Sequence, residues 1–321
     1  MKNAWMTYDE TKIKEVMNLS DDYMAFLSKG KTERKCVSLI LEEAKKHGYK
    51  DINEIIKNKE SLKPQDKVYM NMMNKSVALM HIGNRPIEEG MNILGAHIDS
   101  PRLDLKQNPL YEDGEIAYFD THYYGGVKKY QWVTIPLAIY GVVCLKDGST
   151  IEIEVGDKEE DPVFVISDLL VHLSADQMQK KASEVIEGEN LNVTVGSIPL
   201  NEEEKEPVKA NILKLLKNKY GFEEEDFISA ELEVVPSGKA RSCGFDESMI
   251  LGYGHDDRIC AYTSLRAQLE AMDLERTGVC LLVDKEEVGS NGATGMKFLR
   301  HTIQFMLLPA VQEIRLNLEK D

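Results

Sequence analysis

GVCLLVDKEEVGSNGATG, residues 278–295, is the most informative segment of this sequence. It opens on a continuous apolar run, residues 278–283, which is typical of a strand buried in a parallel sheet. Two adjacent carboxylates, Glu286 and Glu287, follow, and such a pair after a buried strand is electrostatically costly unless cations compensate it. The glycines that come next allow a sharp turn and leave room for a ligand. The segment predicts an α/β domain with a polar site at a strand end, and a solvated acidic turn is the alternative.

Helix and strand patterns extend from this segment in both directions. Apolar spacing and end signals predict helices over residues 9–28, 32–47, 201–220 and 257–272, the second ending at Gly48. Strands are predicted over residues 76–82, 92–98, 231–235 and 249–254, with further strand-like runs between residues 114 and 156. We therefore expect an α/β domain made of residues 1–100 and 236–321, interrupted by a β-rich insert of residues 101–235.

Composition excludes several classes of partner. The 321 residues include 55 acidic and 39 basic side chains, a formal net charge of −16. Binding to nucleic acid or to an anionic membrane surface requires a basic face, so we expect neither. The longest apolar run, residues 132–145, is interrupted by Pro136 and is shorter than the roughly 20 residues of a membrane span. Five scattered cysteines and no evident signal peptide predict a reduced, cytoplasmic protein.

Two further clusters fall at predicted strand ends, where ligands bind in open α/β sheets. In the first, His97 and Asp99 share one face of a strand, so Asp99 is placed to accept the second ring proton of a metal-bound His97. The alternative is a packed histidine beside a capping aspartate. In the second, Asp256 and Asp257 lie at a strand-to-helix turn, where Asp257 fits a helix cap and Asp256 is available to bridge two ions. A histidine, an aspartate and paired glutamates together suit a hydrolytic zinc centre.

Four motifs resemble the M18 family of metallo-aminopeptidases, and they occur in the family's order. They are GAHIDSPRLDLK (95–106), THYYGGVKKYQW (121–132), GYGHDDRICAYTSL (252–265) and DKEEVGSNGATG (284–295). The resemblance implies a three-layer α/β/α zinc-peptidase sandwich interrupted by a β-rich dimerisation domain. It also implies two zinc ions per subunit, with manganese or cobalt as alternatives, and dimers that assemble into a dodecamer.

The resemblance also implies a role for each matching residue. His97 corresponds to a ligand of one zinc, Asp99 to its orienting partner, and Asp256 to the aspartate bridging the two metals. Glu286 corresponds to the general base and Glu287 to a ligand of the other zinc. ISDLLVHLSADQ, residues 166–177, resembles a stretch of the family's insert, so that His172 corresponds to a histidine reaching a neighbouring subunit's substrate pocket. As a lone histidine, His172 is equally compatible with a packing role.

The sequence departs from the family near Arg300. The family's site takes two more ligands, an aspartate and a histidine, from segments after the paired glutamates, and we find no match to those segments. His301 is the only histidine of the residues that follow Arg300. We expect a truncated or frame-shifted product.

Three functions remain open at this point. The first is an aminopeptidase that removes N-terminal residues from peptides, acidic ones included, with a water activated by two metals. The second is an inactive M18-like assembly module. The third is another co-catalytic zinc hydrolase, such as a deacylase or carboxypeptidase, which the YYGG and HDDR contexts disfavour.

Overall fold

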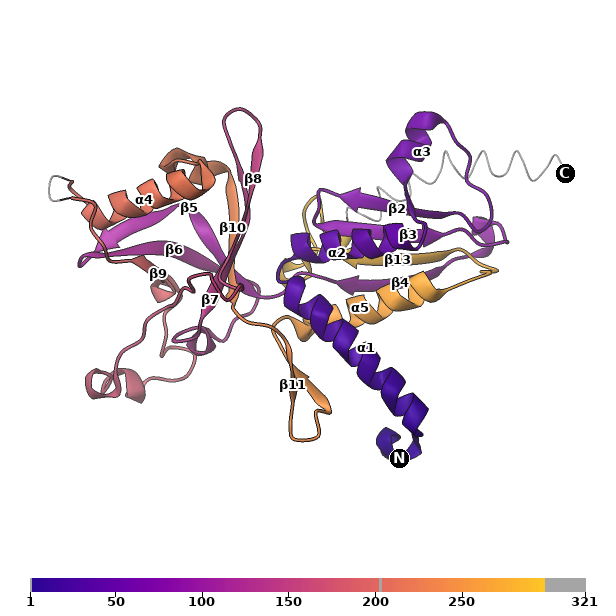
Figure 1. Ribbon diagram of the computed structural model, residues 1–321, viewed down its shortest axis with the longest axis horizontal. Coiled ribbons are helices and arrows are strands. Elements are labelled where there is room, and N and C mark those ends of the chain that lie inside the picture. The colour runs from indigo at the N-terminus through magenta and orange to yellow at the C-terminus, as the bar shows by residue number, and fades with distance from the viewer. Residues whose placement is uncertain (1, 202–203, 298–321) are drawn as a thin grey trace. The chain divides into compact units, whose positions relative to one another are not determined.

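The computed structural model describes residues 2–201 and 204–297 and divides the chain into two compact units (Figure 1). Unit 1 comprises Met1–Ser100 and Lys239–Asp321, and unit 2 comprises Pro101–Gly238. The prediction concerning His301 lies outside the described residues. Among the residues that are described, no helix has the length and apolar character needed to cross a membrane.

Unit 1 is built on a five-stranded sheet with the order β1-β2-β3-β13-β4. The strands are β1 (Lys50–Asp51), β2 (Lys67–Met72), β3 (Ser76–His81), β4 (Asn92–His97) and β13 (Gly278–Val283). The central strand β13 pairs parallel with β4 and antiparallel with β3. A separate two-stranded ribbon pairs β11 (Arg241–Cys243) with β12 (Met249–Leu251), so the strand predicted over 249–254 ends early.

Helices cover both faces of this sheet. They are α1 (Glu10–Lys29), α2 (Glu33–Lys46), α3 (Ile52–Asn58) and α5 (His255–Glu270). Cys280 and Leu282 of β13 pack into a core with α1, α2 and α5, whereas Val279, Leu281 and Val283 pack into a second core with α3. Both faces of β13 are therefore buried, which explains its unbroken apolar run. The predicted α/β/α fold is confirmed.

Local signals fix the helix ends of unit 1. The side chains of Asp9 and Thr32 accept hydrogen bonds from backbone N–H groups in the first turns of α1 and α2. Gly48 follows the end of α2 with φ +84°, a left-handed conformation that glycine adopts without strain. The expected stop at Gly48 is confirmed.

Unit 2 contains a six-stranded antiparallel sheet with the order β8-β7-β10-β5-β6-β9. Its elements are β5 (Arg102–Asp113), β6 (Ile116–Tyr124), β7 (Leu137–Cys144), β8 (Thr150–Val155), β9 (Val193–Gly196), α4 (Pro207–Tyr220) and β10 (Ala230–Pro236). The helix predicted from residue 201 is wrong at its start, because α4 begins at Pro207, a residue favoured in the first helical turn. The long strand β5 was not predicted.

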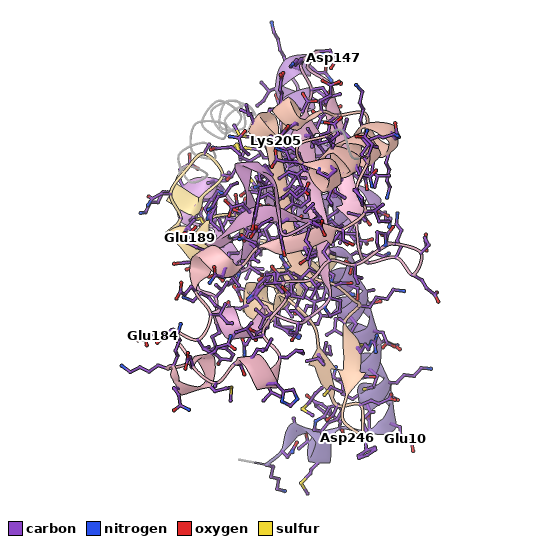
Figure 2. All side chains as sticks on the ribbon, turned by 90° about the vertical axis from the view of Figure 1, so that its left-hand side faces the viewer. Glu10, Asp147, Glu184, Glu189, Lys205 and Asp246 are labelled. Atoms are coloured by element: carbon purple, nitrogen blue, oxygen red, sulfur yellow. The ribbon has the colours of Figure 1, made fainter. Side chains whose placement is uncertain are left out.

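Exposed acidic side chains lie on both units (Figure 2). Glu10 and Asp246 project from unit 1, and Asp147, Glu184 and Glu189 project from unit 2. The excess negative charge is thus carried largely by solvated side chains, where it costs little.

Candidate metal centre

Strand register brings the two halves of the candidate site to one edge of the sheet. His97, the last residue of β4, is aligned with Val283, the last residue of β13. The Ile98 N–H donates a hydrogen bond to the Val283 carbonyl at 2.8 Å, which continues the pairing past the strand ends. Because the strands are parallel, the turn after β13 begins beside His97. That turn contains a short 3₁₀ helix, Glu286–Val288, with both predicted glutamates.

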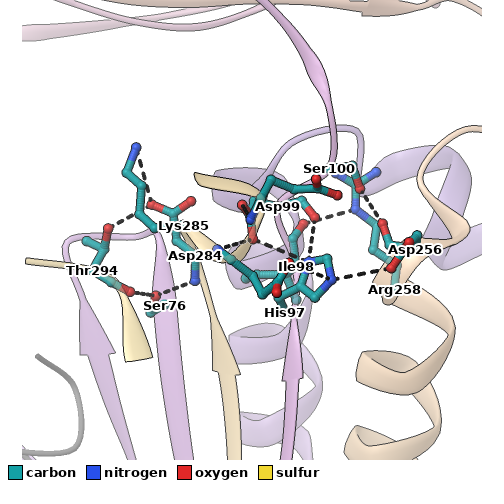
Figure 3. A network of polar contacts seen from close by, with 12 residues as sticks. Ser76, His97, Ile98, Asp99, Ser100, Asp256, Arg258, Asp284, Lys285 and Thr294 are labelled. Carbon is teal, nitrogen blue, oxygen red and sulfur yellow. Dashed lines mark hydrogen bonds and ion pairs between the residues drawn. The ribbon is translucent and has the colours of Figure 1, made fainter. Parts of the chain in front are cut away.

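His97 is the centre of the cluster (Figure 3). Its Nε2 atom lies 3.4 Å from Asp256 Oδ1 and 3.6 Å from Glu286 Oε2. The His97 side chain is only 10% exposed, whereas Asp256 is 87% and Glu286 is 55% exposed. The imidazole is therefore largely buried, and the two carboxylates beside it are open to solvent. Asp256 is in the first turn of α5, and its peptide bond to Asp257 is cis.

Asp99 is a buried residue that contacts both His97 and the turn that carries the glutamates. Its side chain is fully buried, and its Oδ1 atom lies 3.4 Å from His97 Nδ1. The carboxylate also accepts the backbone N–H of Glu286 at 3.3 Å and that of Glu287 at 3.2 Å. His97 Nδ1 lies 3.0 Å from the Asp99 carbonyl oxygen, so Nδ1 is the donor, and in the neutral ring Nε2 is left with its lone pair. Asp99 thus positions the histidine and both glutamates at once.

The electrostatics of the cluster favour a cation. Burial opposes protonation of His97, but hydrogen bonds and charge from Asp99 outweigh it, and with Glu286 they raise the pKa of His97 to about 9. Burial also raises the pKa of Glu287, and the neighbouring carboxylates add to the rise although His97 opposes it. Both shifts favour protonation, which follows when several carboxylates share a partly desolvated site. A bound cation relieves the same repulsion.

The donors gathered here are of the kinds that bind zinc. His97 offers an imidazole nitrogen, and Asp256 offers a carboxylate oxygen 3.4 Å from it. Imidazole nitrogen and carboxylate oxygen are ordinary zinc ligands.

Sequence reasoning missed the groups that support this site. Arg258 is buried, and its guanidinium donates to the carbonyls of Ile98 and Lys31, each at 3.1 Å. Ser100 Oγ donates to the Asp256 carbonyl at 2.9 Å. Gly254 has φ +84°, and a Cβ there would lie 2.1 Å from Arg258 Nη1. The signal that could have revealed this support was Arg258 itself, an arginine next to two aspartates that falls on the same helical stripe as Ala261, Leu265 and Leu269.

His172 belongs to unit 2, whereas the cluster belongs to unit 1. His172 lies in unit 2, in a short 3₁₀ helix, Val171–Leu173, and is exposed. Its assignment to a substrate pocket stays a prediction.

Fold and cluster together define a class of protein. An α/β sheet that gathers imidazole and carboxylate groups at the carboxyl ends of parallel strands has the architecture of an α/β metalloprotein whose ligands bind at the sheet edge.

Comparison with known proteins gives the family. Residues 26–314 match the family described as "Aminopeptidase I zinc metalloprotease (M18)". A probable M18 family aminopeptidase 1 of Clostridium acetobutylicum is 57% identical over 305 residues, covering 94% of this chain and 66% of that protein. The chain therefore belongs to the M18 family of zinc metallo-aminopeptidases.

Solved structures agree with this result. The crystal structure of an M18 family aminopeptidase from Thermotoga maritima superposes with a TM-score of 0.89 at 45% identity, over 98% of this chain and 67% of the other. The crystal structure of aminopeptidase I from Clostridium acetobutylicum superposes with a TM-score of 0.87 at 54% identity, over 95% and 68%. This chain thus spans about two thirds of the length of the relatives it matches.

Proposed function

We propose that this chain is a zinc-dependent aminopeptidase that removes N-terminal residues from peptides. The observation that carries the proposal is the meeting of His97, Asp256 and the paired glutamates around the buried Asp99. In support, the family is one of zinc metalloproteases.

In this proposal, the residues divide the work of binding two metal ions. His97 would hold one ion, Glu287 would hold the other, and both ions would share Asp256. When bound, zinc supplies a Lewis acid that polarises the scissile carbonyl and lowers the pKa of water, and manganese and cobalt offer similar chemistry. Asp99 keeps His97 in the tautomer that presents Nε2.

Glu286 is the proposed general base. Its backbone is fixed by Asp99, while its carboxylate is 55% exposed and so remains accessible to water and substrate. It takes a proton from the attacking water and delivers it to the amine that leaves. The free amino group of a peptide's N-terminus would sit against the metal ions or nearby carboxylates. An acidic N-terminal side chain is one candidate for the preferred substrate, and a neutral one is the other.

His172 and its neighbours support a proposed assembly. Leu169, Leu170, Val171 and Leu173 are between 55% and 71% exposed, a run of apolar side chains that a monomer rarely leaves in water. We propose that this segment of unit 2 contacts further copies of the chain, in dimers that build a dodecamer, and that His172 reaches the substrate pocket of a neighbouring subunit. None of the five cysteines, each of which lies among the described residues, forms a disulfide, and we propose a reducing cytoplasm as the location.

Hydrolysis of aspartyl- and leucyl-nitroanilides by the purified chain tests the activity. Zinc, manganese or cobalt is added in turn, with EDTA as the chelator control and an N-acetylated substrate to exclude a deacylase. Chelator-sensitive release from free-amine substrates is expected, with Glu286→Gln lowering kcat at least about 100-fold while metal content is unchanged. Glu10→Gln, an exposed glutamate of unit 1, is the matched control. Folded protein that releases nothing with any metal would refute the proposal.

The exposed apolar run in unit 2 also favours a second candidate, an inactive M18-like assembly module. Size-exclusion chromatography with light scattering, combined with metal analysis, separates the two. A large oligomer with little bound metal and no turnover indicates the assembly module, and a metal-loaded oligomer with turnover indicates the enzyme.

A further inference from the structure

The loop that follows β13 carries Glu286 and Glu287, and its two ends return to each other. Asp284 forms an isolated parallel bridge with Gly295. In addition, Thr294 Oγ1 donates a hydrogen bond to Asp284 Oδ2 at 2.7 Å. Residues 285–294 therefore form a closed loop, and near its start Glu286 Oε2 lies 3.6 Å from His97 Nε2.

Ser76, the first residue of β3, fastens both ends of this loop to the sheet. Its Oγ accepts the backbone N–H of Asp284 at 2.9 Å and donates to the carbonyl of Thr294 at 2.5 Å. The side chains of Ser76, Asp284 and Thr294 are all buried. We call these three residues the clasp.

Two backbone hydrogen bonds restrict the first half of the loop, residues 285–290. The Ser290 N–H donates to the Lys285 carbonyl at 2.6 Å, and the Gly289 N–H donates to the Glu286 carbonyl at 2.9 Å. Asp99 accepts the N–H groups of both glutamates from the other side. The backbone that carries both glutamates is thus held at two places, by Asp99 at the site and by the clasp at the base of the loop.

Asp284 is a buried carboxylate in a position that disfavours its charge. Burial raises its pKa, and the charge of Glu33 raises it further. Its Oδ1 atom is buried without a hydrogen-bond partner among the described residues, although Lys285 Nζ lies 3.9 Å from Oδ2. A buried carboxylate with one oxygen that lacks a hydrogen-bond partner lowers the free energy of unfolding. Its side chain accepts the hydrogen bond from the Thr294 hydroxyl, and its backbone N–H donates to Ser76 Oγ. Both hydrogen bonds hold the ends of the loop.

We propose that Ser76, Asp284 and Thr294 are positioning residues that order the loop of residues 285–294 and so set where Glu286 and Glu287 stand relative to His97. The inference deepens the proposed function and rests on it for its consequence in metal binding. The ordering of the loop itself does not need a metal, so the two ideas fail separately.

Substitutions of Thr294 in the full chain test the clasp. Thr294→Val removes the hydroxyl at nearly constant shape, and Thr294→Ser keeps it. Thr277→Val is the matched control, because Thr277 is also buried, precedes the other end of β13 and has one hydroxyl hydrogen bond, from the Gly83 N–H at 3.0 Å. Ser76→Ala, which removes the second fastening, serves if Thr294→Val does not fold.

Two readouts are needed, and the first uses metal-free protein. Hydrogen–deuterium exchange of a peptide covering residues 285–293 is expected to quicken at least about fivefold in Thr294→Val, with Thr294→Ser close to the parent and Thr277→Val unchanged in this peptide. The second readout is cobalt binding followed by its visible spectrum. Thr294→Val is expected to weaken binding about tenfold and to alter the spectrum, the usual size of effect for outer groups of a metal site.

The result that would overturn the proposal is loop exchange and cobalt binding in Thr294→Val equal to those of Thr277→Val. If the parent binds neither cobalt nor zinc while Thr294→Val still quickens exchange of the loop, the proposed metal function fails and the clasp's ordering role stands.

Discussion

Asp99→Asn is the most revealing single change at the site, because the Asp99 carboxylate serves three partners. It accepts the N–H groups of Glu286 and Glu287 at 3.3 and 3.2 Å, and its Oδ1 lies 3.4 Å from His97 Nδ1. An asparagine has nearly the same shape, but its NH₂ group faces one of these donors. Leaving one buried N–H without an acceptor costs about 1–3 kcal/mol. We expect the free energy of unfolding to fall by that amount.

The same substitution acts on His97 in the metal-free chain. The main causes that raise the pKa of His97 to about 9 come from Asp99, and burial acts in the opposite direction. Removing the charge is therefore expected to lower the pKa of His97 by about one unit or more, equivalent to at least about 1.4 kcal/mol. Only seven histidines are present, so NMR titration of the imidazole signals, assigned with a His97 variant, can follow this change.

Metal binding supplies the third readout for Asp99→Asn. Affinity for cobalt or zinc is expected to fall about 10- to 100-fold, because the imidazole loses its orienting partner. Asp246→Asn is the control, since it removes an exposed carboxylate from the same unit. The reasoning is refuted if Asp99→Asn leaves the His97 titration and the metal affinity as they are in Asp246→Asn.

Three further changes test other parts of the structure. In urea unfolding, Gly254→Ala is expected to lower the free energy of unfolding by at least about 2 kcal/mol more than Gly48→Ala does. Both glycines have φ +84°, but only at Gly254 does the new Cβ crowd Arg258. Equal losses in the two variants would contradict this reasoning. Burial lowers the pKa of His81 in the folded chain. Below about pH 6.5 the unfolded chain therefore binds more protons than the folded chain does, and the free energy of unfolding falls as the pH drops. His81→Gln is expected to lose less stability than the parent between pH 7.5 and 5.5. Adding zinc at about 100 times its dissociation constant is expected to stabilise the chain by about 2.7 kcal/mol, an increase that EDTA reverses in thermal unfolding.

The sequence predicted those parts of the molecule that local patterns specify. The apolar run of β13 and the capping residues Asp9 and Thr32 carry their own signals, so the α/β class and several helix ends could be inferred. By contrast, β5 was missed because Pro109 and a run of polar residues hide its alternation, and its partners β6 and β10 are what hold it as a strand. Tertiary pairing here outweighs local propensity.

The candidate site was predictable only in its chemistry. Adjacent carboxylates after a buried strand, and a histidine two residues before an aspartate, point to a polar site whatever the fold. The supporting groups could not be found in this way. Ser76 and Thr294 are separated by 218 positions, and Arg258 reaches Ile98 over 160 positions, so these contacts exist only once the sheet has formed.

The register of β4 against β13 links the stability of unit 1 to its chemistry. Ala96 and Ile98 lie in the core with α1, α2 and α5, so His97 between them points to the other face of the strand. A slip of one residue would move both apolar side chains out of this core and turn His97 into it, which is why burial selects the register that presents the histidine. The carbonyl of Ile98 also accepts a hydrogen bond from Arg258, two residues after Asp256. The residues that secure the strand in the core therefore also fix the spacing between His97 and the carboxylates that would share its metal ions.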